Sequence, residues 1–235
     1  DFCLSRGLGD VYKRQDEDEN GYKAGRFLRA SDLGMSGENN EWKPVIQDKL
    51  SQQLLVPNGT MGQRWEEGKK WNLKLETEDG TPIDPMLSMA ESDYHVETIQ
   101  FPYFDSSGDG IFERPIATRT IQLANGEKVK IATVYDLMTS QYGVQRFEHE
   151  LEATSYDDAS SKYTPAWQEQ ITGIKKELVT KVATEFAQNA IDTGGRSMII
   201  MGAGINHWFN SDTIYRSILN LSLIHISEPT RQAEI

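Results

Sequence analysis

The sequence predicts an α/β fold in which an irregular, β-rich first half with a hairpin precedes a helical second half. From Thr120 to Ile131, apolar residues alternate on both sides of Asn125-Gly126, which is typical of a hairpin with a tight turn. Helical spacing runs from about Lys175 to Ile191 and ends at two glycines. The apolar run from Ser197 to Met201 is too short for a helix, so it is typical of a strand buried on both faces.

The segment after this apolar run is the strongest candidate for a binding site. Gly202 and Gly204 flank a tight turn, Asn206 and His207 follow, and helical spacing resumes from Asp212. The order helix, strand, glycine turn, helix predicts a Rossmann-like βα unit, in which ligands bind beyond the carboxyl end of the strand and glycines let the backbone approach a phosphate. We therefore predict that Gly202, Gly204, Asn206 and His207 contact a nucleotide-like ligand.

Two alternatives remain open for this turn. His207 stands where a dinucleotide-binding fingerprint needs its third glycine, which disfavours an ordinary NAD site. The two glycines also occur in turns that are purely structural.

The two ends of the chain do not resemble protein sequence. Residues 1–15 and 222–235 resemble sequencing-adapter read-through that was translated together with a metagenomic fragment, and we expect them to lie outside the native fold. Between them, the sequence predicts a turn-rich β region with the hairpin over residues 16–132. A helical segment with the βα cofactor-binding unit follows over residues 133–221.

Composition excludes several classes of function. The net charge of −12 argues against a nucleic-acid-binding surface. Apolar runs stay well below the roughly 18 residues that span a bilayer. The only cysteine, Cys3, lies in the adapter-like leader, so the remainder has neither a disulfide nor a thiolate metal site. His95 and His149 are isolated in the sequence, and we assign no catalytic and no metal-binding residue.

Three further patterns have both a functional and a structural interpretation. Arg26 and Arg29 could contact an anion or cofactor, but a surface turn is the favoured reading. The segment 105–110 begins like a calcium loop, yet its twelfth position is Ile116 instead of a closing Glu, which favours a solvent loop. Asp157-Asp158 could form a carboxylate pair, although a capping or turn pair is favoured.

Helix boundaries are predicted from their caps. Thr133 is expected to cap a helix from Val134 to Tyr142 that stops at Gly143. Thr164-Pro165 is expected to open another, which Gly173 ends. The longest helix presents an apolar face formed by Leu178, Val179, Val182, Ala183, Phe186, Ala187 and Ala190.

Several stretches together resemble the catalytic alpha subunit of respiratory nitrate reductase, in the dimethyl-sulfoxide-reductase superfamily of molybdopterin oxidoreductases. The resemblance covers nearly all of residues 20–221, and GAGINHWFNSDTIYR is its most specific part. The other stretches are GYKAGRFLRASDLG, PNGTMGQRW with KWNL, FPYF, TVYDLMTSQYG and YTPAWQEQITGIKKELVTKVATEFAQNA.

The resemblance implies an internal fragment of a nitrate-reducing enzyme. The whole enzyme would reduce nitrate to nitrite at a molybdenum bis-(molybdopterin guanine dinucleotide) centre and would also hold a [4Fe-4S] cluster. Quinol would donate electrons through a membrane quinol-oxidising subunit and an iron–sulfur beta subunit, which would attach the enzyme to the cytoplasmic face of the membrane. The turn from Gly202 to His207 would touch a pterin–guanine dinucleotide.

The ligands of the metal and the cluster lie upstream of this segment in the family, so the fragment alone is expected to be inactive. Two alternatives are kept: another molybdopterin oxidoreductase of the same superfamily, and a nicotinamide-binding or purely structural βα module.

Overall fold

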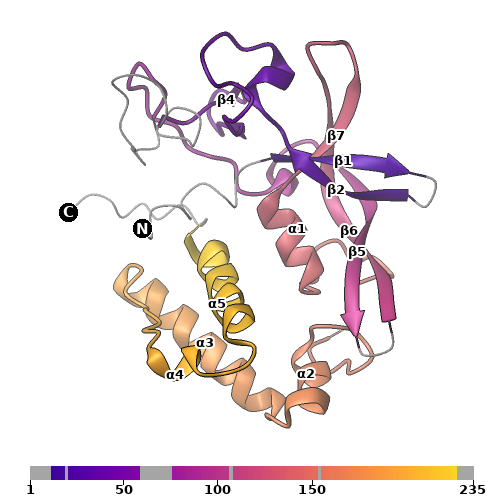
Figure 1. The fold of residues 1–235 in the computed structure, drawn as a ribbon, viewed down its shortest axis with the longest axis vertical. Coiled ribbons are helices and arrows are strands. Elements are labelled where there is room, and N and C mark those ends of the chain that lie inside the picture. Colours follow the sequence, from indigo (N-terminus) through magenta and orange to yellow (C-terminus); the bar gives the residue numbers. More distant parts are fainter. Residues whose placement is uncertain (1–11, 19–20, 59–75, 106–107, 153–154, 227–235) are drawn as a thin grey trace.

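The computed structural model describes residues 12–18, 21–58, 76–105, 108–152 and 155–226. Strands dominate the first half and helices the second, which confirms the predicted mixed α/β class (Figure 1). Helix α1 (Val134–Gln141) contacts β6 (Gly108–Gln122) and β7 (Lys128–Thr133) as well as α5 (Ser211–Ile226), so it connects the two halves. No helix in the described ranges combines the length and the apolar character needed to cross a bilayer.

A closed five-stranded barrel forms the core of the first half. Its strands follow one another around the barrel in the order β1-β2-β5-β6-β7. All neighbouring pairs are antiparallel except β2 with β5. Closure gives the main-chain groups at both edges a partner. The three remaining strands of the barrel are β1 (Tyr12–Asp18), β2 (Gly21–Phe27) and β5 (His95–Asp105).

The predicted hairpin is confirmed by β6 and β7. Residues Arg119 to Gln122 pair with Lys128 to Ile131, and Gly126 adopts a φ of 85°, which favours glycine. The segment 105–110 joins β5 and β6 as a second hairpin, although residues 106–107 lie outside the described part.

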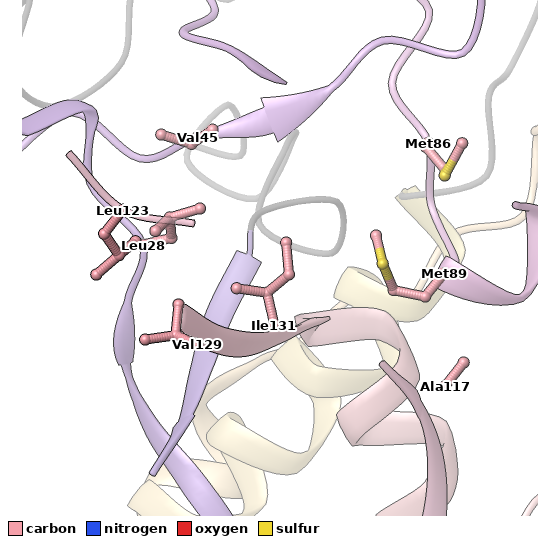
Figure 2. Close-up of a cluster of buried hydrophobic side chains, with 8 residues drawn as sticks. All are labelled: Leu28, Val45, Met86, Met89, Ala117, Leu123, Val129 and Ile131. Atoms are coloured by element: carbon pink, nitrogen blue, oxygen red, sulfur yellow. The ribbon is translucent and has the colours of Figure 1, made fainter. Parts of the chain in front are cut away.

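Two buried clusters stabilise the barrel. One joins β6 and β7 to the connections around them, and Figure 2 shows its members: Leu28, Val45, Met86, Met89, Ala117, Leu123, Val129 and Ile131. The second joins β5, β6, β7 and α1 through Ile99, Phe101, Phe112, Ile116, Ala132 and Leu137. Smaller elements complete this half: the paired strands β3 (Ile46–Gln47) and β4 (Leu54–Leu55) and the 3-10 helices η2 (Ala30–Leu33) and η4 (Met89–Glu91).

The predicted helix caps are confirmed. The Thr133 hydroxyl accepts a hydrogen bond from the Asp136 backbone N–H at the start of α1, and Thr164 accepts one from Trp167 at the start of α2 (Pro165–Thr172). Gly173 ends α2 with a φ of 72°. The helices that follow are α3 (Lys176–Thr193), α4 (Ala203–Asn206) and α5.

The predicted central strand does not form in this structure. Residues 197–201 form no helix and belong to no described strand, and the side chains of Met198 and Ile200 are 75% and 82% exposed. The 18-residue helix α3 has no buried residue either. A strand buried on both faces requires neighbouring strands, and none of the described strands pairs with this run. The Rossmann-like unit is therefore not confirmed.

Both predicted borders of the adapter-like ends fall inside secondary structure. Strand β1 already begins at Tyr12, and α5 continues to Ile226. Residues 12–15 and 222–226 therefore have a defined backbone structure, while the borders at 15 and 222 stay a prediction about where the native sequence begins and ends. Main-chain hydrogen bonds build both extensions, and such bonds depend only weakly on side-chain identity. Residues 1–11 and 227–235 lie outside the described ranges.

Candidate functional site

Helix α3 and the segment that leaves it position the glycine turn. The helix ends at Gly194 and Gly195, whose φ values of 72° and 86° favour glycine. The segment after the helix then runs back along α3, because the Ser197 hydroxyl donates to the Phe186 carbonyl at 2.8 Å. The Asn189 side-chain amide in turn donates to the Ser197 hydroxyl, also at 2.8 Å. These side-chain bonds tie the apolar run to the helix before the turn begins.

The turn itself contains all four predicted site residues. Gly202 is the N-cap of the four-residue helix α4, and His207 is its C-cap. The side-chain oxygen of Asn206 accepts a hydrogen bond from the Tyr215 hydroxyl on α5, which fixes the turn against that helix. Asn206 and His207 are both exposed. The structure thus presents Gly202, Gly204, Asn206 and His207 together on one surface.

Neither glycine of the turn is required by the local backbone or by local packing. Gly202 has a φ of −130°, and Gly204 is not among the residues with positive φ. Apart from chain neighbours and the backbone of α4, a Cβ atom added to either would meet no described atom within 4 Å. The space beside both glycines is therefore open. Because glycine has no side chain, a ligand could approach the backbone more closely there than at a residue of any other type.

Large apolar side chains surround this turn. Phe209 is fully exposed and Trp208 is 69% exposed, and Ile200 precedes the turn with a similar exposure. Exposed apolar side chains in such a concentration mark a surface that another group or chain segment covers. We call this set, together with Met198 and the apolar side of α3, the apolar surface of the helical half.

The described residues provide no cluster of metal-ligating side chains. Within them, no group of three or more His, Cys, Asp or Glu side chains could hold a metal ion. His149 accepts a hydrogen bond from the Leu151 backbone N–H through Nδ1, at 3.2 Å, which is a local turn contact. Asp158 likewise accepts from the Ser160 backbone N–H and hydroxyl, which supports its interpretation as a turn residue.

The two arginines around the end of β2 have internal partners. Arg26 donates to both carboxylate oxygens of Asp32, and Arg29 donates to the Trp42 carbonyl at 2.9 Å. Burial alone would raise the pKa of Asp32, but the hydrogen bonds from Arg26 and from the Arg29 backbone hold that pKa below its ordinary value. These contacts support the surface-turn interpretation of Arg26 and Arg29.

Sequence reasoning missed a buried polar cluster around Asp136. This side chain is 0% exposed and accepts hydrogen bonds at both oxygens. Oδ1 accepts from the Ser88 hydroxyl at 2.7 Å and from Arg146 at 2.5 Å. Oδ2 accepts from the Met89 backbone N–H at 2.7 Å and from the Thr133 hydroxyl at 2.8 Å. The cluster joins η4, α1 and the loop after α1, so it stabilises the fold near the barrel.

The comparisons with known proteins identify close relatives. No protein-family profile matches the chain. The "Nitrate reductase alpha chain" of Bacillus subtilis (strain 168) is 53% identical over 208 residues, which are 88% of this chain and 17% of the relative. The "Respiratory nitrate reductase 1 alpha chain" of Escherichia coli (strain K12) is 41% identical over 214 residues, 85% of this chain and 17% of the relative. The chain thus spans about a sixth of the length of these relatives.

A more distant relative has a different name. The "Perchlorate reductase subunit alpha" of Dechloromonas aromatica (strain RCB) is 23% identical over 203 residues, which are 86% of this chain and 17% of the relative.

Proposed function

Since most of this chain is a segment of the nitrate reductase alpha-chain family, we propose that it is part of the catalytic subunit of a respiratory nitrate reductase. The subunit reduces nitrate to nitrite at a molybdenum bis-(molybdopterin guanine dinucleotide) centre. The observation that carries this proposal is 53% identity over 208 residues, against 23% for the perchlorate reductase relative. This difference favours nitrate over another oxyanion as the substrate.

The exposed glycine turn fits one part of the cofactor. Gly202 and Gly204 leave open space beside the backbone, and Asn206 and His207 offer polar side chains next to it. We assign to these four residues the contact with the pterin or pyrophosphate portion, where hydrogen bonds hold and orient the cofactor. The bound molybdenum supplies the electron transfer and oxygen-atom chemistry. The [4Fe-4S] cluster and the metal take their ligands from other parts of the subunit.

The apolar surface of the helical half supports a place inside a larger fold. In the full-length subunit, residues 197–201 become a strand of a Rossmann-like sheet, and strands from elsewhere in the alpha chain cover Met198 and Ile200. Two observations support this: these side chains are exposed here, and the relatives are about six times longer than the matched segment. An iron–sulfur beta subunit and a membrane quinol-oxidising subunit supply the electrons and hold the enzyme at the cytoplasmic face of the membrane.

A chimeric enzyme tests the proposed function. Residues 16–221 replace the aligned segment of the Bacillus subtilis alpha chain, which is then expressed with its partner subunits in a strain that lacks its own nitrate reductase. We expect anaerobic growth on nitrate and nitrite formation by the purified chimera. A chimera that holds molybdenum but turns over only perchlorate or chlorate would favour the other oxyanion, and one that binds nicotinamide dinucleotide would contradict the proposal.

A further inference from the structure

Strand β1 occupies a slot between β2 and β7 and closes the barrel there (Figure 1). On one side, residues Tyr12 to Gln15 lie antiparallel to Lys130 to Thr133 of β7. On the other side, residues Gln15 to Asp18 lie antiparallel to Gly21 to Ala24 of β2. Without β1, two strand edges would face each other with unpaired N–H and C=O groups. The barrel therefore needs a strand at this position, and the main chain of that strand supplies the hydrogen-bond partners that the two edges require.

Two polar side-chain atoms in the middle of β1 lack partners in this slot. Only three buried side-chain polar atoms in the described residues lack a hydrogen-bond partner, and two of them are Arg14 Nε and Gln15 Oε1. Gln15 is 5% exposed, and its Nε2 donates to the Lys13 carbonyl of its own strand. Burial also lowers the pKa of Lys13, with Asp16 as a partial compensation. The Lys13 ammonium lies over the Phe27 ring, and another nitrogen of Arg14 donates to Glu127 at 3.0 Å. The buried atoms without a partner in this strand are therefore Arg14 Nε and Gln15 Oε1.

The pairing register changes at the same place. Residues Gln15 to Asp18 pair one-to-one with β2, but the register shifts between Lys13 and Gln15. These two features lie at the border where we expect the adapter-like leader to end. A foreign strand that pairs through its main chain, yet leaves some buried polar side-chain atoms without a partner, would produce this combination.

We propose that the slot between β2 and β7 is an acceptor site for an antiparallel strand of the alpha chain itself, supplied by the polypeptide that precedes residue 16 in the full-length subunit. Residues 12–15 occupy that site in its place. The natural strand carries an apolar side chain at the position of Gln15, which lies opposite Ala24 and Lys130. Lys130 is already paired with Glu97 at 2.5 Å, so it needs no polar partner from β1. This inference is independent of the chemistry proposed for the subunit.

Point substitutions in the intact chain test the misfit. We expect Gln15→Val to slow hydrogen exchange of the β7 amides about tenfold, because a buried oxygen without a partner is removed. Gln53→Val, the same change at an exposed position, should leave β7 unaffected. Arg14→Pro removes a main-chain donor from the strand and should speed exchange in both β2 and β7. Unchanged or faster exchange in Gln15→Val and Gln15→Leu would contradict the claim that Gln15 fits the slot poorly. Full protection of β2 and β7 in Arg14→Pro would contradict the claim that residues 12–15 pair with these strands.

A graft tests the identity of the occupant. Residues 1–15 are replaced by the fifteen residues that precede the aligned segment in the Bacillus subtilis relative, with a scrambled version of the same fifteen residues as control. The native-order graft should protect the β2 and β7 amides more strongly than either the scrambled graft or the present residues 1–15. Equal or weaker protection would show that the slot takes its strand from elsewhere.

Discussion

The buried cluster around Asp136 allows a stability prediction that follows from hydrogen-bond geometry. Both oxygens of Asp136 accept two hydrogen bonds each, from Ser88 and Arg146 at Oδ1 and from Met89 and Thr133 at Oδ2. In Asp136→Asn, the side-chain amide must replace one of these oxygens, so its N–H₂ group faces donors in either orientation. The substitution also leaves Arg146, whose side chain is only 17% exposed, without its carboxylate.

The expected loss is about 3–5 kcal/mol, the usual cost of removing one partner from a buried pair. With a denaturant dependence of about 2 kcal/mol per molar urea, the unfolding midpoint should fall by about 1.5–2.5 M. Hydrogen-exchange mass spectrometry in increasing urea, followed on the α1 and β7 amides, reports this midpoint for the barrel half. Asp93→Asn, at an exposed position, should change it by no more than about 0.3 M. An Asp136→Asn midpoint equal to that of the control would refute the reasoning.

Three further predictions concern pH, the apolar surface and the turn. Burial would raise the pKa values of Asp32 and Asp48, but hydrogen bonds hold both below the ordinary value of 3.8. The stability that these ionised carboxylates add should be complete above pH 3.8 and should be lost as the pH falls through the lowered pKa values. Asp48→Asn should therefore flatten the curve of unfolding free energy against pH in acid. Met198→Lys with Ile200→Lys should reduce self-association of the isolated chain in sedimentation velocity, and unchanged association would show that other residues cause it. In the chimera, His207→Ala should lower cofactor content or shift the molybdenum potential, through loss of a hydrogen bond of about 1 kcal/mol; parental values for both would leave His207 a structural role.

Local chemistry explains which elements could be predicted from the sequence. Thr133, Thr164 and Gly173 were identified correctly because a cap involves residues only a few positions apart. The hairpin turn at Asn125-Gly126 is equally local. The central strand failed because burial of residues 197–201 depends on neighbouring strands that the described chain does not provide. The apolar pattern of this run is typical of a strand that neighbouring strands cover in a larger fold, whereas the described residues leave it exposed.

The long-range features carried no sequence signal. The parallel pairing of β2 with β5 joins Tyr22 to Ile99 and closes the barrel, but nothing in either strand specifies that partner. Asp136 has partners, Ser88 and Arg146, that lie 48 and 10 residues away in the sequence. The four residues of the candidate site lie together because they are adjacent in the sequence. Their exposure, and the open space beside the glycines, became visible only in the structure.

The central claim is that the turn from Gly202 to His207 holds the cofactor of a nitrate-reducing subunit. The most direct test is the molybdenum and guanine-nucleotide content of the purified chimera that carries Gly204→Val. Apart from its chain neighbours and the backbone of α4, no described atom lies within 4 Å of a Cβ at that position. We therefore expect the added side chain to clash with whatever the turn binds or packs against in the assembled enzyme. We expect cofactor content to fall at least several-fold, while Ala124→Val, at an exposed turn in the barrel half, keeps the parental content. Full cofactor content and nitrate turnover in Gly204→Val would contradict the account.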